Sequence, residues 1–123
     1  MDSDLITLCA LTDLNDPGAK GFDLDFNLDR YGRPLRIIVT RLGDKAFGWI
    51  NSCPHAWVPL DVEPNQFMDM TGQFLLCSYH GAAFTLGSGV CLRGPCKGRK
   101  LMSFPLKLED GMIKIKPSGQ EDH

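Results

Sequence analysis

The chain has 123 residues, of which 43% are hydrophobic and 23% are charged, and its formal net charge at pH 7 is −2. This length suits one domain, residues 1–123, with a core large enough to fold without disulfide bonds. The acidic balance argues against nucleic-acid binding. No apolar run reaches the roughly 20 residues of a membrane-spanning helix, and the acidic start Met1-Asp2-Ser3-Asp4 is unlike a signal peptide. We therefore expect a cytoplasmic protein.

Antiparallel strands are predicted for the first half of the chain. Residues 22–28 alternate apolar and polar side chains, which is the period of a half-buried strand. Two apolar runs, 35–39 and 46–50, are separated by Gly43-Asp44, which predicts a hairpin. No long amphipathic helix is indicated, and one short helical turn is expected near 11–15 or within 62–70.

The second half of the chain continues the β pattern after an irregular segment. Residues 61–71 have no clear periodicity and are expected to form an inserted flap. Strands are predicted for 104–108 and 112–115, joined by Glu109-Asp110-Gly111, because Asp-Gly between alternating segments is a strong hairpin signal. The tail after Pro117 is expected to be disordered.

Two short pairs of metal-ligand residues stand out between the strands. They are Cys53-Pro54-His55 and Cys77-Ser78-Tyr79-His80, separated by the 21 residues from Ala56 to Leu76. A binuclear iron–sulfur cluster needs four terminal ligands, two on each iron. Two histidines on one iron and two cysteines on the other make the Rieske type, whose potential lies above that of all-thiolate ferredoxins.

A structural zinc site is the alternative that uses the same residue types. Zinc sites typically space their ligands as C-x(2–4)-C and H-x(3–5)-H. Here each pair mixes the two types, and one residue separates Cys53 from His55. Ligand type and spacing therefore favour the iron–sulfur cluster.

The segments CPHAWVPL (53–60) and CSYHGAAF (77–84) resemble the Rieske [2Fe–2S] family, in particular its small soluble ferredoxins. The resemblance implies an all-β Rieske fold of stacked antiparallel β-sheets with a smaller cluster-binding subdomain at about 51–98. It also implies one [2Fe–2S] cluster per chain. Cys53 and Cys77 would bind the inner iron, and His55 and His80 the outer iron that accepts the electron.

The resemblance implies an electron-transfer protein rather than an enzyme. Rieske oxygenases need a second iron held by two histidines and a carboxylate, and only His123 remains here after the cluster ligands. The leading hypothesis is a ferredoxin that passes electrons from a flavin-containing reductase to a terminal oxygenase of the aromatic-ring hydroxylating type. The alternatives are the small electron-transfer subunit of a nitrite-reductase-like enzyme and a zinc-stabilised binding domain.

Two segments near the ligand pairs bear on access to the cluster. Trp57 stands where the family usually has glycine, and it is either a core anchor or an exposed residue at the docking edge. Gly94-Pro95 matches the proline-containing segment that shields the cluster from water in this family.

Three further cysteines are interpreted as structural. Cys9 lies in an apolar strand segment and is expected to be a small core residue. Cys91 and Cys96 flank a four-residue segment; a metal role is disfavoured because the cluster already has four ligands. A disulfide is uncommon in the cytosol, so a redox role is the less favoured alternative.

Charge is unevenly distributed along the sequence. Residues 1–29 contain seven acids against Lys20 alone. Residues 93–100 contain Arg93, Lys97, Arg99 and Lys100 without an acid. A solvated loop is the simpler interpretation of this basic stretch, and a docking rim for an acidic partner is the alternative.

The second loop also predicts a low redox potential. High-potential Rieske subunits resemble CPCHGSHYD, in which serine and tyrosine hydroxyls donate hydrogen bonds to the sulfurs. Ala82 and Phe84 stand at those positions, and Val58 and Tyr79 replace the cysteines of the loop-bridging disulfide. The potential is therefore expected toward the bottom of the Rieske range of about −150 to +300 mV.

Overall fold

A computed structural model of the chain describes residues 5–28, 32, 34–52, 60, 67–77, 81–94 and 97–116, without the side chains of 25–28. Within these residues the protein consists of antiparallel strands and one short 3-10 helix, η2 (Leu11–Asp13). The strands form three sheets: sheet A, with β1 (Ile6–Ala10), β10 (Met112–Ile115) and β9 (Lys107–Glu109); sheet B, with β2 (Gly18–Leu28), β3 (Pro34–Leu42), β4 (Lys45–Ile50) and β8 (Ser103–Phe104); and sheet C, with β5 (Phe74–Leu76), β6 (Ala83–Thr85) and β7 (Cys91–Arg93). The predicted all-β fold is confirmed.

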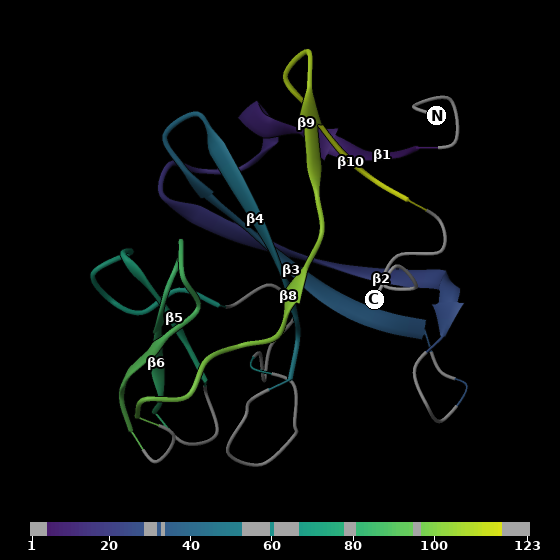
Figure 1. Ribbon diagram of the computed structural model, residues 1–123. Helices are drawn as coiled ribbons and strands as arrows, with labels where there is room; N and C mark the ends of the chain where they lie inside the picture. Colours follow the sequence, from purple (N-terminus) through teal and green to yellow (C-terminus); the bar gives the residue numbers. More distant parts are fainter. Residues whose placement is uncertain are drawn as a thin grey trace.

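Sheet B separates two hydrophobic cores. Figure 1 shows β1, β9 and β10 on one side of the long strands β2 to β4, and β5 and β6 on the other. The base core lies between sheets A and B and consists of Leu11, Leu14, Leu24, Ile37, Val39, Phe104, Ile113 and Ile115. The loop core lies between sheets B and C and consists of Ile38, Trp49, Leu60, Phe67, Leu75, Cys77, Ala82, Phe84, Leu86, Cys91 and Leu101.

The middle of β3 explains how one sheet serves both cores. Ile37, Ile38 and Val39 are each 0% exposed. Because successive side chains of a strand point to opposite faces, Ile37 and Val39 enter the base core while Ile38 enters the loop core. A strand buried on both faces needs a continuous apolar run, which is the pattern that the sequence has here.

Most predicted elements of the first half are confirmed. The hairpin through Gly43-Asp44 joins β3 to β4, with Leu42 opposite Lys45 and Ile37 opposite Ile50. The alternating segment 22–28 lies in β2, which pairs with β3. The short helical turn is η2. No helix in the described part of the chain is long and apolar enough to cross a membrane.

The predicted strand 104–108 was wrong in one respect, because the structure divides it between two sheets. Phe104 ends β8 and pairs with Gly48 in sheet B, whereas Lys107 begins β9 and pairs with Lys114 in sheet A. Pro105 lies at the division. Proline has no N–H to continue a strand ladder, so the chain leaves one sheet there and enters the other. The β9–β10 hairpin at Asp110-Gly111 is as predicted.

The irregular flap predicted for 61–71 is partly wrong. Residues 61–66 lie outside the described part, but Phe67 is buried and Met68 pairs with Leu75. The turn between these arms is built on Asp69, whose Oδ1 accepts a hydrogen bond from Thr71 Oγ1 at 2.8 Å. That bond, with others from backbone N–H groups, lowers the pKa of Asp69. Residues 67–76 are therefore a hairpin that leads into Cys77.

Candidate metal centre

Cys77 lies immediately after β5, at the start of a tight backbone turn. Its N–H donates to the carbonyl of Ala82 at 2.8 Å, and its carbonyl accepts from the N–H of Gly81 at 2.8 Å. Gly81 has a φ of 71°, a conformation that glycine adopts without a steric penalty. The Cys77 side chain is 0% exposed. The turn therefore holds a buried thiol at the end of sheet C.

The other three predicted ligands lie outside the described residues. They are Cys53, His55 and His80, together with the neighbouring residues Trp57, Val58 and Tyr79. What the structure does describe is the base of the first ligand loop, where residues 52 and 60 flank the segment 53–59.

Asn51 closes the base of that first loop. Its side-chain Oδ1 accepts a hydrogen bond from the N–H of Leu60 at 2.8 Å, and its own N–H donates to the carbonyl of Arg36 at 2.9 Å. The Asn51 side chain thus joins the two ends of the loop, and it is only 7% exposed. Sequence reasoning missed this residue, although a polar side chain directly after an apolar strand and two positions before Cys53 was a signal.

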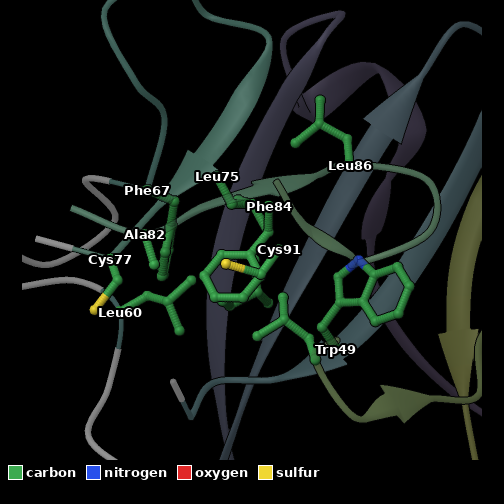
Figure 2. Close-up of a cluster of buried hydrophobic side chains, with 11 residues drawn as sticks. Trp49, Leu60, Phe67, Leu75, Cys77, Ala82, Phe84, Leu86 and Cys91 are labelled. Atoms are coloured by element: carbon green, nitrogen blue, oxygen red, sulfur yellow. The ribbon is translucent and has the colours of Figure 1, made fainter. Parts of the chain in front are cut away.

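The bases of the two ligand loops meet in the loop core. Leu60, at the end of the first loop, and Cys77, at the start of the second, are both 0% exposed and belong to this core. Figure 2 shows the sulfur of Cys77 at the edge of the core, pointing away from the ring of Phe84. The structure therefore brings together two segments that are far apart in the sequence.

Gly94, from the segment predicted to shield the cluster, lies against Ala82 of the second ligand loop. A Cβ added to Gly94 would lie 2.7 Å from the Cα of Ala82, closer than van der Waals contact allows. Gly94 also has a φ of 103°. Glycine is thus required both by the backbone conformation and by the close approach. Pro95 lies outside the described residues.

The described cysteines other than Cys77 have structural surroundings. Cys91 is buried, and its Sγ donates a hydrogen bond to the carbonyl of Arg93 at 3.1 Å. Cys9 packs against the base core, which confirms its predicted place. Burial raises the pKa of the Cys9 thiol, and the nearby carboxylate of Asp13 raises it further, so this thiol stays protonated at neutral pH. Cys96 lies outside the described residues.

The described surroundings of Cys77 fit a terminal ligand of an iron–sulfur cluster. Thiolates hold such clusters, and burial with hydrogen bonds to the sulfurs tunes them. Cys77 supplies a buried sulfur at the edge of the core. Its loop is packed on Gly94, and its neighbour Leu60 belongs to the loop that carries Cys53 and His55.

The chain belongs to the Rieske [2Fe-2S] domain family, because a sequence model of that family matches residues 6–108. The predicted [2Fe–2S] cofactor, one per chain, is thereby confirmed. Among curated protein sequences, none matches this chain.

Solved structures of Rieske proteins have the same fold. The ferredoxin of carbazole 1,9a-dioxygenase from Nocardioides aromaticivorans IC177 is similar with a TM-score of 0.66 and 21% identity, over 93% of this chain and 98% of that one. A chain from a complex of reduced oxygenase and oxidized ferredoxin in carbazole 1,9a-dioxygenase has a TM-score of 0.64 and 20% identity, over 97% and 98%. A longer chain from the reduced complex of oxygenase and ferredoxin is matched over 28% of its length, with a TM-score of 0.67 and 20% identity.

Proposed function

We propose that this protein is a Rieske-type ferredoxin that carries single electrons from a flavin-containing reductase to a terminal oxygenase of the aromatic-ring hydroxylating type. The observation that carries this proposal is the nearly complete overlap with the ferredoxin of carbazole 1,9a-dioxygenase, over 93% of this chain and 98% of that one. The overlap supports a role as a ferredoxin, because the protein that it matches is itself a ferredoxin. The family match and both ligand pairs supply the redox centre.

The proposed ligands are Cys53 and Cys77 on the inner iron and His55 and His80 on the outer iron. The cluster, when bound, accepts and releases one electron at the histidine-bound iron. The residues of the chain position it: Asn51 closes the first loop, and the turn at Cys77 presents a buried sulfur. Gly94 packs on the second loop and so brings the shielding segment close to the site.

Three further statements belong to this proposal. The chain performs no oxygenation by itself, because only His123 remains for a second iron site. Residues 1–123 form one domain whose cluster-binding subdomain spans about 51–98; all three strands of sheet C fall within those bounds. The protein works in the cytoplasm, where reductases draw electrons from nicotinamide cofactors.

The cluster and its ligands are tested by metal and sulfide analysis with electron paramagnetic resonance. We expect about two irons and two acid-labile sulfides per chain, and a low-average-g signal after reduction. Cys53→Ala, His55→Ala, Cys77→Ala and His80→Ala should each lose the cluster, because an iron then lacks a ligand. Cys9→Ala, outside the site, should retain it. Stoichiometric zinc in protein expressed with ample iron would contradict the proposal.

The carrier role is tested by reconstitution with a flavin-containing reductase and a terminal oxygenase of the aromatic-ring hydroxylating type. Product should form only when the loaded ferredoxin, the reductase and the oxygenase are all present. Oxygenation by the chemically reduced chain alone would show that it is an enzyme. Electron transfer to a nitrite reductase, with none to the oxygenase, would favour the second hypothesis instead.

A further inference from the structure

The described residues of the basic stretch, Arg93, Gly94 and 97–100, are called here the basic loop, and the start of this loop lies beside the second ligand loop. Arg93 is opposite Ala83 in the pairing of β7 with β6. Gly94 presses on Ala82, and the N–H of Lys97 donates to the carbonyl of Gly94 at 3.2 Å. The loop returns along β7, where the N–H of Cys91 donates to the carbonyl of Arg99 at 2.7 Å. Arg93 and Gly94, at the start of the loop, therefore lie next to the second ligand loop, whereas Arg99 and Lys100 lie farther along β7, where Lys100 pairs with Val90.

The four cationic side chains of the basic loop all face solvent. Arg93, Lys97, Arg99 and Lys100 are exposed. Leu92, which directly precedes them, is an apolar side chain with 46% exposure. An apolar contact point bordered by charge is the composition of a transient docking surface.

Several described acids lie away from the ligand loops. Asp44 is in the β3–β4 turn, and Asp16 Oδ1 accepts from the N–H of Gly43 in the same turn at 2.7 Å. This turn and Asn51 lie at opposite ends of β4, roughly 20 Å apart for a six-residue strand. Asp23, nearer the ligand loops, is paired with Arg36 at 3.2 Å.

We propose that the basic loop, with Leu92, is the surface on which the terminal oxygenase docks, and that the oxygenase presents an acidic surface to it. The proposal rests on the proposed carrier function, since it names the charge of the protein that receives the electron. Cationic side chains next to the second ligand loop, with Asp16 and Asp44 at the far end of β4, orient the molecule in the field of an acidic partner. In an encounter, the end of the protein that carries the ligand loops then faces the partner.

The first test measures the local charge without any protein partner. The reduced, cluster-loaded protein is oxidised in a stopped-flow instrument by ferricyanide, an anion, or by hexaammineruthenium(III), a cation. The double variant K97E/K100E reverses two charges of the basic loop. The matched control K20E/K45E reverses two exposed charges on β2 and β4, so both variants have the same net charge.

At low ionic strength, K97E/K100E should slow oxidation by ferricyanide by roughly tenfold and speed oxidation by hexaammineruthenium(III). Added salt should diminish both effects, because mobile ions screen the charges. K20E/K45E should change each rate much less. Equal changes in the two double variants would overturn the proposal, since the rates would then report net charge only.

The second test uses the oxygenase as acceptor. K97E/K100E should raise the KM for the ferredoxin and leave kcat at saturation and the iron content unchanged. If the wild-type protein does not support turnover, the carrier function fails, while the oxidant rates still report on the charge beside the cluster. If it does support turnover and K97E/K100E has the same KM, the docking surface is wrong although the carrier function stands.

Discussion

Asn51 is a single side chain on which the geometry of the first ligand loop depends. Its Oδ1 satisfies the N–H of Leu60, a residue that is itself 0% exposed. A buried N–H without an acceptor costs about 1–3 kcal/mol. We therefore expect Asn51→Ala to lower the free energy of unfolding by about that amount and to release iron faster.

Denaturant unfolding followed by visible absorbance measures both effects. Gln73→Ala removes an exposed amide side chain and serves as the control, with a change of at most about 0.5 kcal/mol. Equal stability and iron retention in Asn51→Ala and Gln73→Ala would show that the Asn51–Leu60 contact does not support the loop.

Ala82 and Phe84 set the expected redox potential at the residue scale. Both are 0% exposed members of the loop core, and Ala82 accepts the hydrogen bond from the N–H of Cys77. A hydrogen bond from a hydroxyl group to a cluster sulfur stabilises the reduced cluster, which carries one more negative charge. Ala82→Ser and Phe84→Tyr should therefore each raise the midpoint potential, measured by protein-film voltammetry. A wild-type midpoint above roughly +150 mV, in the upper part of the Rieske range, would contradict this explanation.

Gly94 and Gly98, both in the basic loop, allow the effect of backbone strain to be measured separately from the effect of close packing on Ala82. Both have positive φ, 103° and 92°, so alanine is strained at either position, by about 1–3 kcal/mol. A Cβ at Gly94 would meet Ala82, whereas a Cβ at Gly98 would meet nothing within 4 Å. Gly94→Ala should therefore push the loop away and speed cluster loss in air by several-fold over Gly98→Ala. The decay of visible absorbance measures this, and equal decay in the two variants would refute it.

At the scale of elements, one buried hydroxyl connects sheet B to the turn after β6. Thr40 is 0% exposed, and its Oγ1 donates to the carbonyl of Leu86 at 2.7 Å. The same oxygen accepts a hydrogen bond from Nε1 of Trp49 at 3.2 Å. Figure 2 shows Trp49 and Cys77 at opposite ends of the loop core. These hydrogen bonds therefore connect β3 of sheet B to the end of the loop core that is opposite Cys77.

Thr40→Val keeps the shape of the side chain but removes the hydroxyl. The Nε1–H of Trp49 and the carbonyl of Leu86 would then be buried without this partner, at a cost of about 1–3 kcal/mol. Trp49→Phe removes the indole donor. We expect the double variant to be more stable than the sum of the two single effects predicts, because they share one interaction. Additive unfolding free energies would contradict the coupling.

At the scale of the whole molecule, the two cores should differ in how far their stability depends on the cluster. The loop core contains Cys77 and Leu60, whereas the base core contains no ligand-loop residue among those described. Loss of the cluster should therefore weaken sheet C and leave sheets A and B protected. Hydrogen exchange of Cys77→Ala and the wild type measures this. Uniform loss of protection in all three sheets would show that the cores unfold as one unit.

Most strands could be predicted from sequence because the evidence is local. The apolar run 37–39 predicts a buried strand, and the Asp-Gly turn at 110–111 predicts a hairpin. Each signal is contained within a few residues. The error at 104–108 arose because an apolar pattern does not tell which sheet a strand joins. Pro105 marked the break, but its consequence depended on the pairing partners of Phe104 and Lys107.

The proposed ligand pairs could likewise be identified from sequence, because the chemistry of Cys and His at such short spacing depends on the residue types themselves. The sequence by itself thus determined the family, the cofactor and the β-rich fold. Only the tertiary structure decided that Asn51 closes the first loop, that Gly94 lies on Ala82, and that the basic loop begins beside the second ligand loop. The partners in these contacts depend on how the sheets pack, whereas periodicity gives the buried face of a strand without naming what covers it.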